Sequence, residues 1–224
     1  MVEAIRKSRR SAVQKRRGAG RPATREVAGR MEKLFDTAAA VFLEHGFENA
    51  NVSEIAARAG ASKGTIYSRY PTKADLFAAV LTRQTLELQV YDAEILTSHK
   101  PLKQVLESYG VRLLQRVFNS EWTALYKVFI AKSPMFPKLT SNFWEVGPRQ
   151  SMAMLRDYLA KHPEFKGKDP GHAAEMFWSL CCGQAVLKAL LQKEHAMSEA
   201  AIRAKVKEAI RIFLSAYSKA SNMR

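Results

Sequence analysis

Cysteine is scarce in this sequence of 224 residues, which has only Cys181 and Cys182. Adjacent cysteines rarely bridge each other, and their spacing does not suit a metal site. The pair therefore predicts neither a disulfide framework nor a metal centre. An oxidant sensor is also disfavoured, because no base or cation adjoins the pair in sequence to lower a thiol pKa. Both residues are interpreted as small apolar core residues.

Long hydrophobic runs are also lacking. No uninterrupted apolar stretch approaches the ~20 residues that a membrane helix needs, and no apolar segment follows the charges at the N-terminus, as it would in a secretory signal. We therefore expect a reduced, cytoplasmic protein without a membrane partner.

Catalytic motifs are missing as well. The five histidines are scattered, and none falls in an H-E-x-x-H pattern. Neither a Walker loop nor a G-x-S-x-G motif is present, and no glycine-rich dinucleotide loop follows a strand pattern. The chain is predicted not to be an enzyme and to need no cofactor and no metal.

Positive charge is what the sequence has in excess, with a formal net charge of +15. Residues 1–25 hold nine Lys and Arg against Glu3 alone, whereas residues 26–80 are nearly neutral. Gly18, Gly20 and Pro22 interrupt any helix in the basic segment. We therefore expect a disordered basic arm over residues 1–24 and a polyanionic partner.

Apolar residues recur at spacings of three and four along most of the remaining chain, and no strand-like alternation appears. This pattern predicts an all-α fold, with a three-helix unit at 25–72 and a larger helical domain at 73–224. Helices are expected at about 25–45, 52–59, 62–69, 72–88, 102–118, 122–131, 143–159, 172–193 and 198–218. Gly147-Pro148 should kink the seventh of these.

The second and third predicted helices are short and meet at Gly60. Asn51 with Glu54 forms a capping-box pattern before the first of them, and Ser62 caps the second. Two short helices joined by a tight turn form a helix-turn-helix, whose second helix lies in the major groove of DNA. Cationic and hydroxyl side chains there suit phosphates and base edges. The candidate DNA contacts are Lys63, Thr65, Tyr67, Ser68, Arg69, Tyr70 and, for a phosphate, Lys73.

Residues 31–80 resemble the N-terminal DNA-binding domain of the TetR family, through the runs 42–47, 52–67 and 70–77. Asn51 stands where the family usually has Thr, and Ser68-Arg69 where many members have His or Asn, so the base preference cannot be transferred. Residues 136–139, 143–148 and 169–174 with Gly183 resemble the AcrR/AefR-like branch. The resemblance implies a homodimer and a C-terminal domain that takes a small molecule.

The resemblance also predicts a ligand pocket and a dimer interface in the C-terminal half. Aromatic and sulfur side chains there are expected to line an apolar ligand pocket, although ordinary core is the alternative for each residue. The pocket candidates are Tyr126, Phe129, Trp144, Met152 and Trp178. The resemblance places the dimer interface on the last two helices, with the candidates Leu180, Leu187, Leu191, Val206, Ile210, Phe213 and Tyr217.

Two functions remain open at this point. The first is a sequence-specific regulator, expected to be a repressor that a small apolar ligand releases from a palindromic double-stranded operator. The second is a ligand-independent DNA-binding nucleoid or adaptor protein, which the basic arm fits equally well. A high specificity ratio over random DNA and a response to ligand would distinguish the first from the second.

The arm itself allows two interpretations. Arg17 and Arg21 resemble arginines that enter a narrow minor groove, and the alternative is a tail that binds any polyanion.

If the arm contacts DNA, deletion of residues 1–22 lowers the affinity for DNA and reduces the slope of log affinity against log salt by several units. Fluorescence anisotropy at several salt concentrations measures this slope, and an unchanged slope would show that the arm does not touch DNA.

Overall fold

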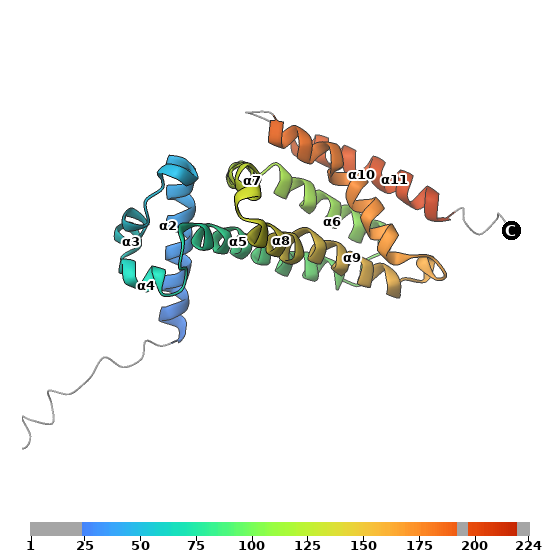
Figure 1. Ribbon diagram of the computed structural model, residues 1–224. Helices are drawn as coiled ribbons and strands as arrows, with labels where there is room; N and C mark the ends of the chain where they lie inside the picture. The colour runs from blue at the N-terminus through green and yellow to red at the C-terminus, as the bar shows by residue number, and fades with distance from the viewer. Residues whose placement is uncertain (1–23, 192–196, 219–224) are drawn as a thin grey trace, which may run out of the picture.

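The computed structural model describes residues 24–191 and 197–218, and over these residues it is built of helices without a strand (Figure 1). The all-α prediction is confirmed. Arg17 and Arg21 lie outside the described residues. Within the described ranges, no helix combines the length and the apolar character that crossing a membrane requires.

The helix α2 (Thr24–Asn49) supplies the scaffold of the N-terminal unit. Leu34, Ala38, Val41 and Phe42 recur at helical spacing and are all buried. Gly46 leaves the helical conformation, with φ 71° and ψ 171°. The predicted helix end at Gly46 is confirmed, and one further turn follows to Asn49.

The helices α3 (Val52–Ala59) and α4 (Lys63–Tyr67) form the predicted helix-turn-helix. Asn51 caps α3 by accepting a hydrogen bond from the Ser53 amide at 2.8 Å. The reciprocal half of the predicted capping box does not form, because the Glu54 carboxylate pairs with Arg58 at 2.7 Å. Gly60 turns the chain in the left-handed conformation, with φ 71° and ψ 31°.

The helix α4 is shorter than the predicted 62–69. The amides of Arg69 and Tyr70 both donate to the Ile66 carbonyl, at 3.1 and 2.8 Å, which closes the helix in a tight turn. Pro71 follows, and a proline disfavours helical conformation in the residue before it.

The helix α5 (Lys73–Leu96) begins at the predicted capping box, in which Thr72 and Asp75 bond each other's backbone amides. It then runs from the N-terminal unit along the rest of the molecule (Figure 1), eight residues beyond the predicted end. The remaining elements are α6 (Leu102–Val117), α7 (Ser120–Lys132), η1 (Ser133–Met135), α8 (Pro137–Trp144), η2 (Glu145–Arg149), α9 (Gln150–Lys161), η3 (Pro163–Phe165), α10 (Pro170–Leu191) and α11 (Glu199–Ser218).

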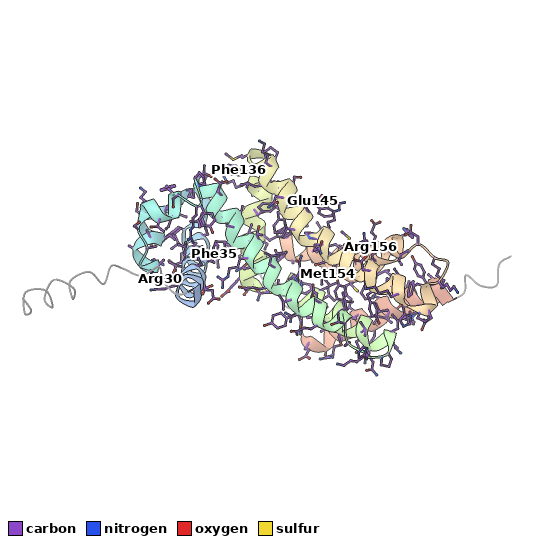
Figure 2. All side chains as sticks on the ribbon, turned by 90° about the horizontal axis from the view of Figure 1, so that it is seen from below. Arg30, Phe35, Phe136, Glu145, Met154 and Arg156 are labelled. Atoms are coloured by element: carbon purple, nitrogen blue, oxygen red, sulfur yellow. The ribbon has the colours of Figure 1, made fainter. Side chains whose placement is uncertain are left out.

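The predicted kink at Gly147-Pro148 takes the form of the π-helical turn η2 between α8 and α9. A proline in a helix leaves carbonyl groups without an amide partner. The Gln89 side chain, on α5, donates to a different carbonyl of this turn, that of Val146, at 2.5 Å and so ties η2 to α5. Figure 2 shows the chain from Phe136 through Glu145 and Met154 leading away from the end of the molecule that holds α2.

Among the residues that the structure describes, buried apolar side chains form two hydrophobic cores. One joins α6, α9, α10 and α11 at the far end of the molecule. The other joins α2, α3, α4 and the first half of α5, and it also includes Leu125 and Phe129 of α7 and Phe143 of α8. The helix-turn-helix unit therefore shares its core with the larger helical domain, across the expected boundary at residue 72.

We predict that Gly60→Ala lowers the free energy of unfolding by about 1–2 kcal/mol, because a Cβ strains the left-handed backbone conformation. Gly29→Ala is the matched control. Gly29 lies in α2, and no atom lies within 4 Å of the position that a Cβ would take there, so the same change should stabilise by about 0.5–1 kcal/mol. Urea unfolding at fixed protein concentration measures both, and equal stability of Gly60→Ala and wild type would contradict the prediction.

Candidate nucleic-acid interface

The helix α4 is attached to the protein by Ile66, whose side chain is only 1% exposed. The predicted contacts Lys63, Thr65, Tyr67 and Ser68 are all exposed. Burial of one apolar side chain of this size contributes about 1.5–3 kcal/mol, which holds so short a helix in place. The structure thus brings these polar side chains together on the outer surface of α4.

Local hydrogen bonds order the outward side chains. The Ser62 hydroxyl accepts from the Thr65 amide at 3.0 Å and lies 2.7 Å from the Thr65 hydroxyl. The Ser68 hydroxyl donates to the Thr65 carbonyl at 2.9 Å. Lys63 and Tyr67 are one helical turn apart, and the ammonium lies 5.8 Å from the ring centroid. The surface therefore offers a cation, an aromatic hydroxyl and aliphatic hydroxyls, which suit phosphate and base-edge contacts.

The structure corrects the expected surroundings of Tyr70 and Lys73. Tyr70 is partly buried, its ring meets Phe35 edge-on at 5.9 Å, and burial raises the pKa of its phenol. The Lys73 ammonium donates to the carbonyls of Glu48 and Ala50, at 2.7 and 3.2 Å. Both side chains therefore contact α2, Tyr70 at Phe35 and Lys73 at Glu48 near the end of the helix.

Arg69 is exposed, and its guanidinium also donates to the Met31 sulfur of α2 at 2.7 Å. Lys33 was missed by the sequence reasoning. Its ammonium would lie 3.9 Å from a Cβ at Gly60, so it flanks the turn between α3 and α4. Periodicity places Lys33 on the polar face of α2, but only tertiary packing sets that face beside the turn.

A cluster of exposed charges borders the same unit. The Arg58 guanidinium pairs with Glu44 at 2.8 Å and with Glu54 at 2.7 Å. His45 lies 3.4 Å from Glu54. The hydrogen bond that Arg58 donates to Glu44 raises the pKa of the Arg58 guanidinium. The two carboxylates and the histidine approach metal-ligand spacing, but Arg58 already pairs with both carboxylates, and we interpret the cluster as an ion-pair network.

An apolar cavity of about 70 Å³ lies among α5, α6, α7, α9 and α10. Two of the predicted pocket residues, Tyr126 and Trp178, line it. Trp144 is 51% exposed and Met152 is outside the lining, whereas their neighbours Phe143 and Ser151 face the cavity. One residue along a helix rotates the side chain by about 100°, so the expected register was off by one at both positions. Phe129 packs behind the wall, 4.6 Å from Phe143.

A second, larger cavity of about 330 Å³ opens between α5, α6 and α7. The sequence analysis did not predict this cavity, because it considered aromatic and sulfur side chains and most residues that line the cavity are polar or charged. Arg116 and Trp122 line both cavities and so separate them. Arg116 is held by fully buried Asp92, at 2.7 Å between guanidinium and carboxylate. The remaining lining residues of the larger cavity are Gln84, Glu87, Leu88, Tyr91, Arg112, Gln115, Asn119 and Glu121.

Comparison with known families decides what the chain is. Residues 34–80 match the family described as bacterial regulatory proteins, tetR family, and residues 104–219 match the AefR-like transcriptional repressor, C-terminal domain. The second match alone spans over half of the chain. The protein belongs to the TetR family. It is a transcriptional regulator with a helix-turn-helix DNA-binding domain, in a family of regulators that are not enzymes.

Two curated relatives match part of the chain. The HTH-type transcriptional repressor SCO4008 of Streptomyces coelicolor is 38% identical over 68 residues, covering 30% of this chain and 35% of its own. The HTH-type transcriptional activator FasR of Mycolicibacterium smegmatis is 39% identical over 75 residues, covering 30% and 34%. The chain spans about a third of the length of these relatives.

Solved structures match almost the whole fold. A TetR-family regulator from Mesorhizobium loti has a TM-score of 0.77 and 22% identity, covering 84% of this chain and 96% of its own. The flavonoid-responsive regulator FrrA has a TM-score of 0.66 and 28% identity, covering 84% and 97%.

The expected dimer residues of this TetR-family protein divide into three groups. Val206, Ile210 and Phe213 are buried in the core of the protomer itself, which corrects their assignment to a surface. Leu187 and Leu191 are 57% and 76% exposed. Leu180 and Tyr217 are partly buried. The apolar stripe of α11 packs on α6 and α10 within the protomer.

Cys181 and Cys182 are fully buried, as interpreted from the sequence. Burial raises the pKa of the Cys181 thiol to about 12 and also raises that of Cys182. A thiol with a raised pKa holds little thiolate and reacts slowly with oxidants. Both residues serve as apolar packing against α6.

We predict that Lys63→Gln weakens DNA binding and reduces the salt slope by about one unit, as expected for loss of one phosphate contact. Lys161→Gln, at the end of α9, removes the same charge away from α4 and should leave both unchanged. Anisotropy titrations at several salt concentrations with a DNA fragment from beside the gene measure both variants. If the slope of log affinity against log salt is the same for Lys63→Gln as for the wild type, Lys63 does not contact a phosphate.

Proposed function

We propose that this protein is a homodimeric repressor that binds a palindromic operator through α4 and leaves it when a small ligand occupies the cavities of the regulatory domain. The observation that carries the proposal is the continuity between the cavity wall and the core beneath α4. Support also comes from the AefR-like repressor match and from FrrA, a regulator described as flavonoid-responsive.

The route from cavity to helix-turn-helix is a chain of aromatic contacts. Phe143 lines the apolar cavity and lies 5.7 Å from Tyr126 and 4.6 Å from Phe129. These three belong to or pack against the core that includes Phe42 and Phe77, whose ring centroids are 4.8 Å apart. A close-packed core does not absorb a displaced ring locally. A ligand that moves Phe143 should therefore shift α2 and α4.

A second connection is polar and begins at the larger cavity. Glu87 lines this cavity and accepts from Arg83 at 2.8 Å. Arg83 also pairs with Asp36 of α2 at 2.7 Å and stacks on Phe35 at 5.6 Å. Phe35 in turn meets Tyr70, three residues after the end of α4. The ligand-bearing region and the DNA-reading helix are thus joined by two independent sets of contacts.

The dimer is supported by the exposed apolar side chains of the last two helices. Met176, Leu187 and Leu191 are exposed on α10, and Ile212 is exposed on α11. Large exposed apolar groups on neighbouring helices favour burial against a second copy. Two copies related by a two-fold axis present two α4 helices to successive major grooves, which calls for a palindromic site.

The test is binding of the purified protein to the DNA that flanks its own gene, with and without a panel of apolar compounds. We expect binding at least ~10³-fold tighter than to random DNA at one palindromic site, with release by some of the compounds. A transcription assay with the same promoter should show lower output with protein and recovery with ligand. Higher output would instead show an activator, like FasR.

The alternative is the ligand-independent nucleoid or adaptor protein, favoured by the net charge of +15. It predicts steeply salt-dependent binding with little preference for sequence. If the protein binds a single site tightly and no compound weakens this binding, the result would support sequence-specific DNA binding and refute the ligand response.

A further inference from the structure

Unmatched buried polar atoms are gathered around the two cavities. In the part of the chain that the structure describes, the buried side-chain atoms without a hydrogen-bond partner are Gln84 Oε1, Asp92 Oδ1, Arg112 Nε, Arg116 Nε, Trp122 Nε1 and Ser151 Oγ. Every one of these residues lines a cavity, except Asp92, which pairs with the lining residue Arg116.

Such clustering is informative because buried polar groups in native proteins are nearly always bonded. Leaving one unmatched costs about 1–3 kcal/mol. Three of the atoms are N–H donors on Arg112, Arg116 and Trp122, all of which line the larger cavity. The three donors are themselves buried within the cavity wall, so an acceptor that enters the cavity can bond them when these side chains turn toward it.

The charges of the larger cavity favour an anion. Arg116 is neutralised by Asp92, and Glu87 is bound by Arg83. Glu121 lies at the exposed first turn of α7, where solvent screens it. Arg112 stacks on the Tyr91 ring at 4.3 Å, and among the described residues no carboxylate forms an ion pair with it. A guanidinium held flat in this way suits the two oxygens of a carboxylate.

The smaller cavity has the opposite character. Its walls include Tyr126, Phe143 and Trp178, and Trp122 faces both spaces. The Trp122 indole is stacked on Tyr126 at 4.6 Å, with its N–H among the unmatched donors. Trp122 stands between the two cavities, so a molecule occupies both only when the Trp122 ring moves aside, and it then meets donors at one end and aromatic rings at the other.

We propose that the ligand is an amphipathic carboxylate. Its carboxylate binds in the larger cavity on Arg112 and the Trp122 N–H, and its apolar body extends past Trp122 into the smaller cavity. This inference rests on the proposed ligand response and replaces the expectation of a purely apolar ligand.

The experiment measures binding to the full-length protein without DNA, by calorimetry and by tryptophan fluorescence. The probes are hexanoate, decanoate and 4-phenylbutanoate, each with its methyl ester and its primary alcohol. We expect at least one acid to bind tenfold or more tightly than its ester and its alcohol. Arg112→Gln should remove most of this preference while still binding the alcohol, which shows that the cavity is folded.

Arg156→Gln is the matched control, since Arg156 is exposed on α9 and pairs only with the adjacent Asp157 among the described residues. Figure 2 shows Arg156 near the end of the molecule away from α2. This variant should keep the wild-type preference. The proposal is overturned if no acid binds below millimolar concentration, if ester or alcohol binds as tightly as the acid, or if Arg112→Gln keeps the preference.

The two proposals fail separately. Acids that bind through Arg112 but leave operator affinity unchanged would refute the ligand response and uphold the carboxylate site. Release from the operator by alcohols as readily as by acids would uphold the ligand response and refute the carboxylate site.

Discussion

The aromatic core shared by α2, α5, α7 and α8 is the constraint on which the rest of the structure depends. Phe47 meets Phe77 at 5.5 Å and Phe136 at 5.8 Å, both edge-to-face, so one ring of α2 packs against elements on both sides of it. Each such pair adds about 0.5–1.5 kcal/mol to the burial of its area. The DNA-reading helix is carried by this core and has no independent anchor beyond Ile66. Its orientation therefore follows the packing of this shared core.

The same packing explains why the cavities lie where they do. Phe143 of the shared core lines the apolar cavity, and Gly147 and Pro148 of the π-helical turn form another part of its wall. Arg116 and Asp92 place a buried ion pair in this wall. A buried pair of this kind costs desolvation energy that its attraction roughly repays, so we interpret it as a positioning element for the cavity rather than a source of stability.

Sequence reasoning succeeded where the signal is local. The caps at Asn51, Ser62 and Thr72 and the turn at Gly60 depend on residues within a few positions, and each lies where it was expected. It failed by one residue at the cavity wall, where only the neighbours of Trp144 and Met152 face inward. A helix that is apolar on several sides does not reveal from its sequence which side meets the cavity.

The sequence by itself therefore determined the all-α fold, the helix-turn-helix and the polar face of α4, because helical periodicity and capping are short-range. Tertiary structure alone decided which predicted contacts turn inward, as Lys73 does toward the α2 carbonyls. It also decided that Val206 and Phe213 serve the protomer core. These outcomes depend on contacts between residues far apart in the chain, and periodicity carries no information about such partners.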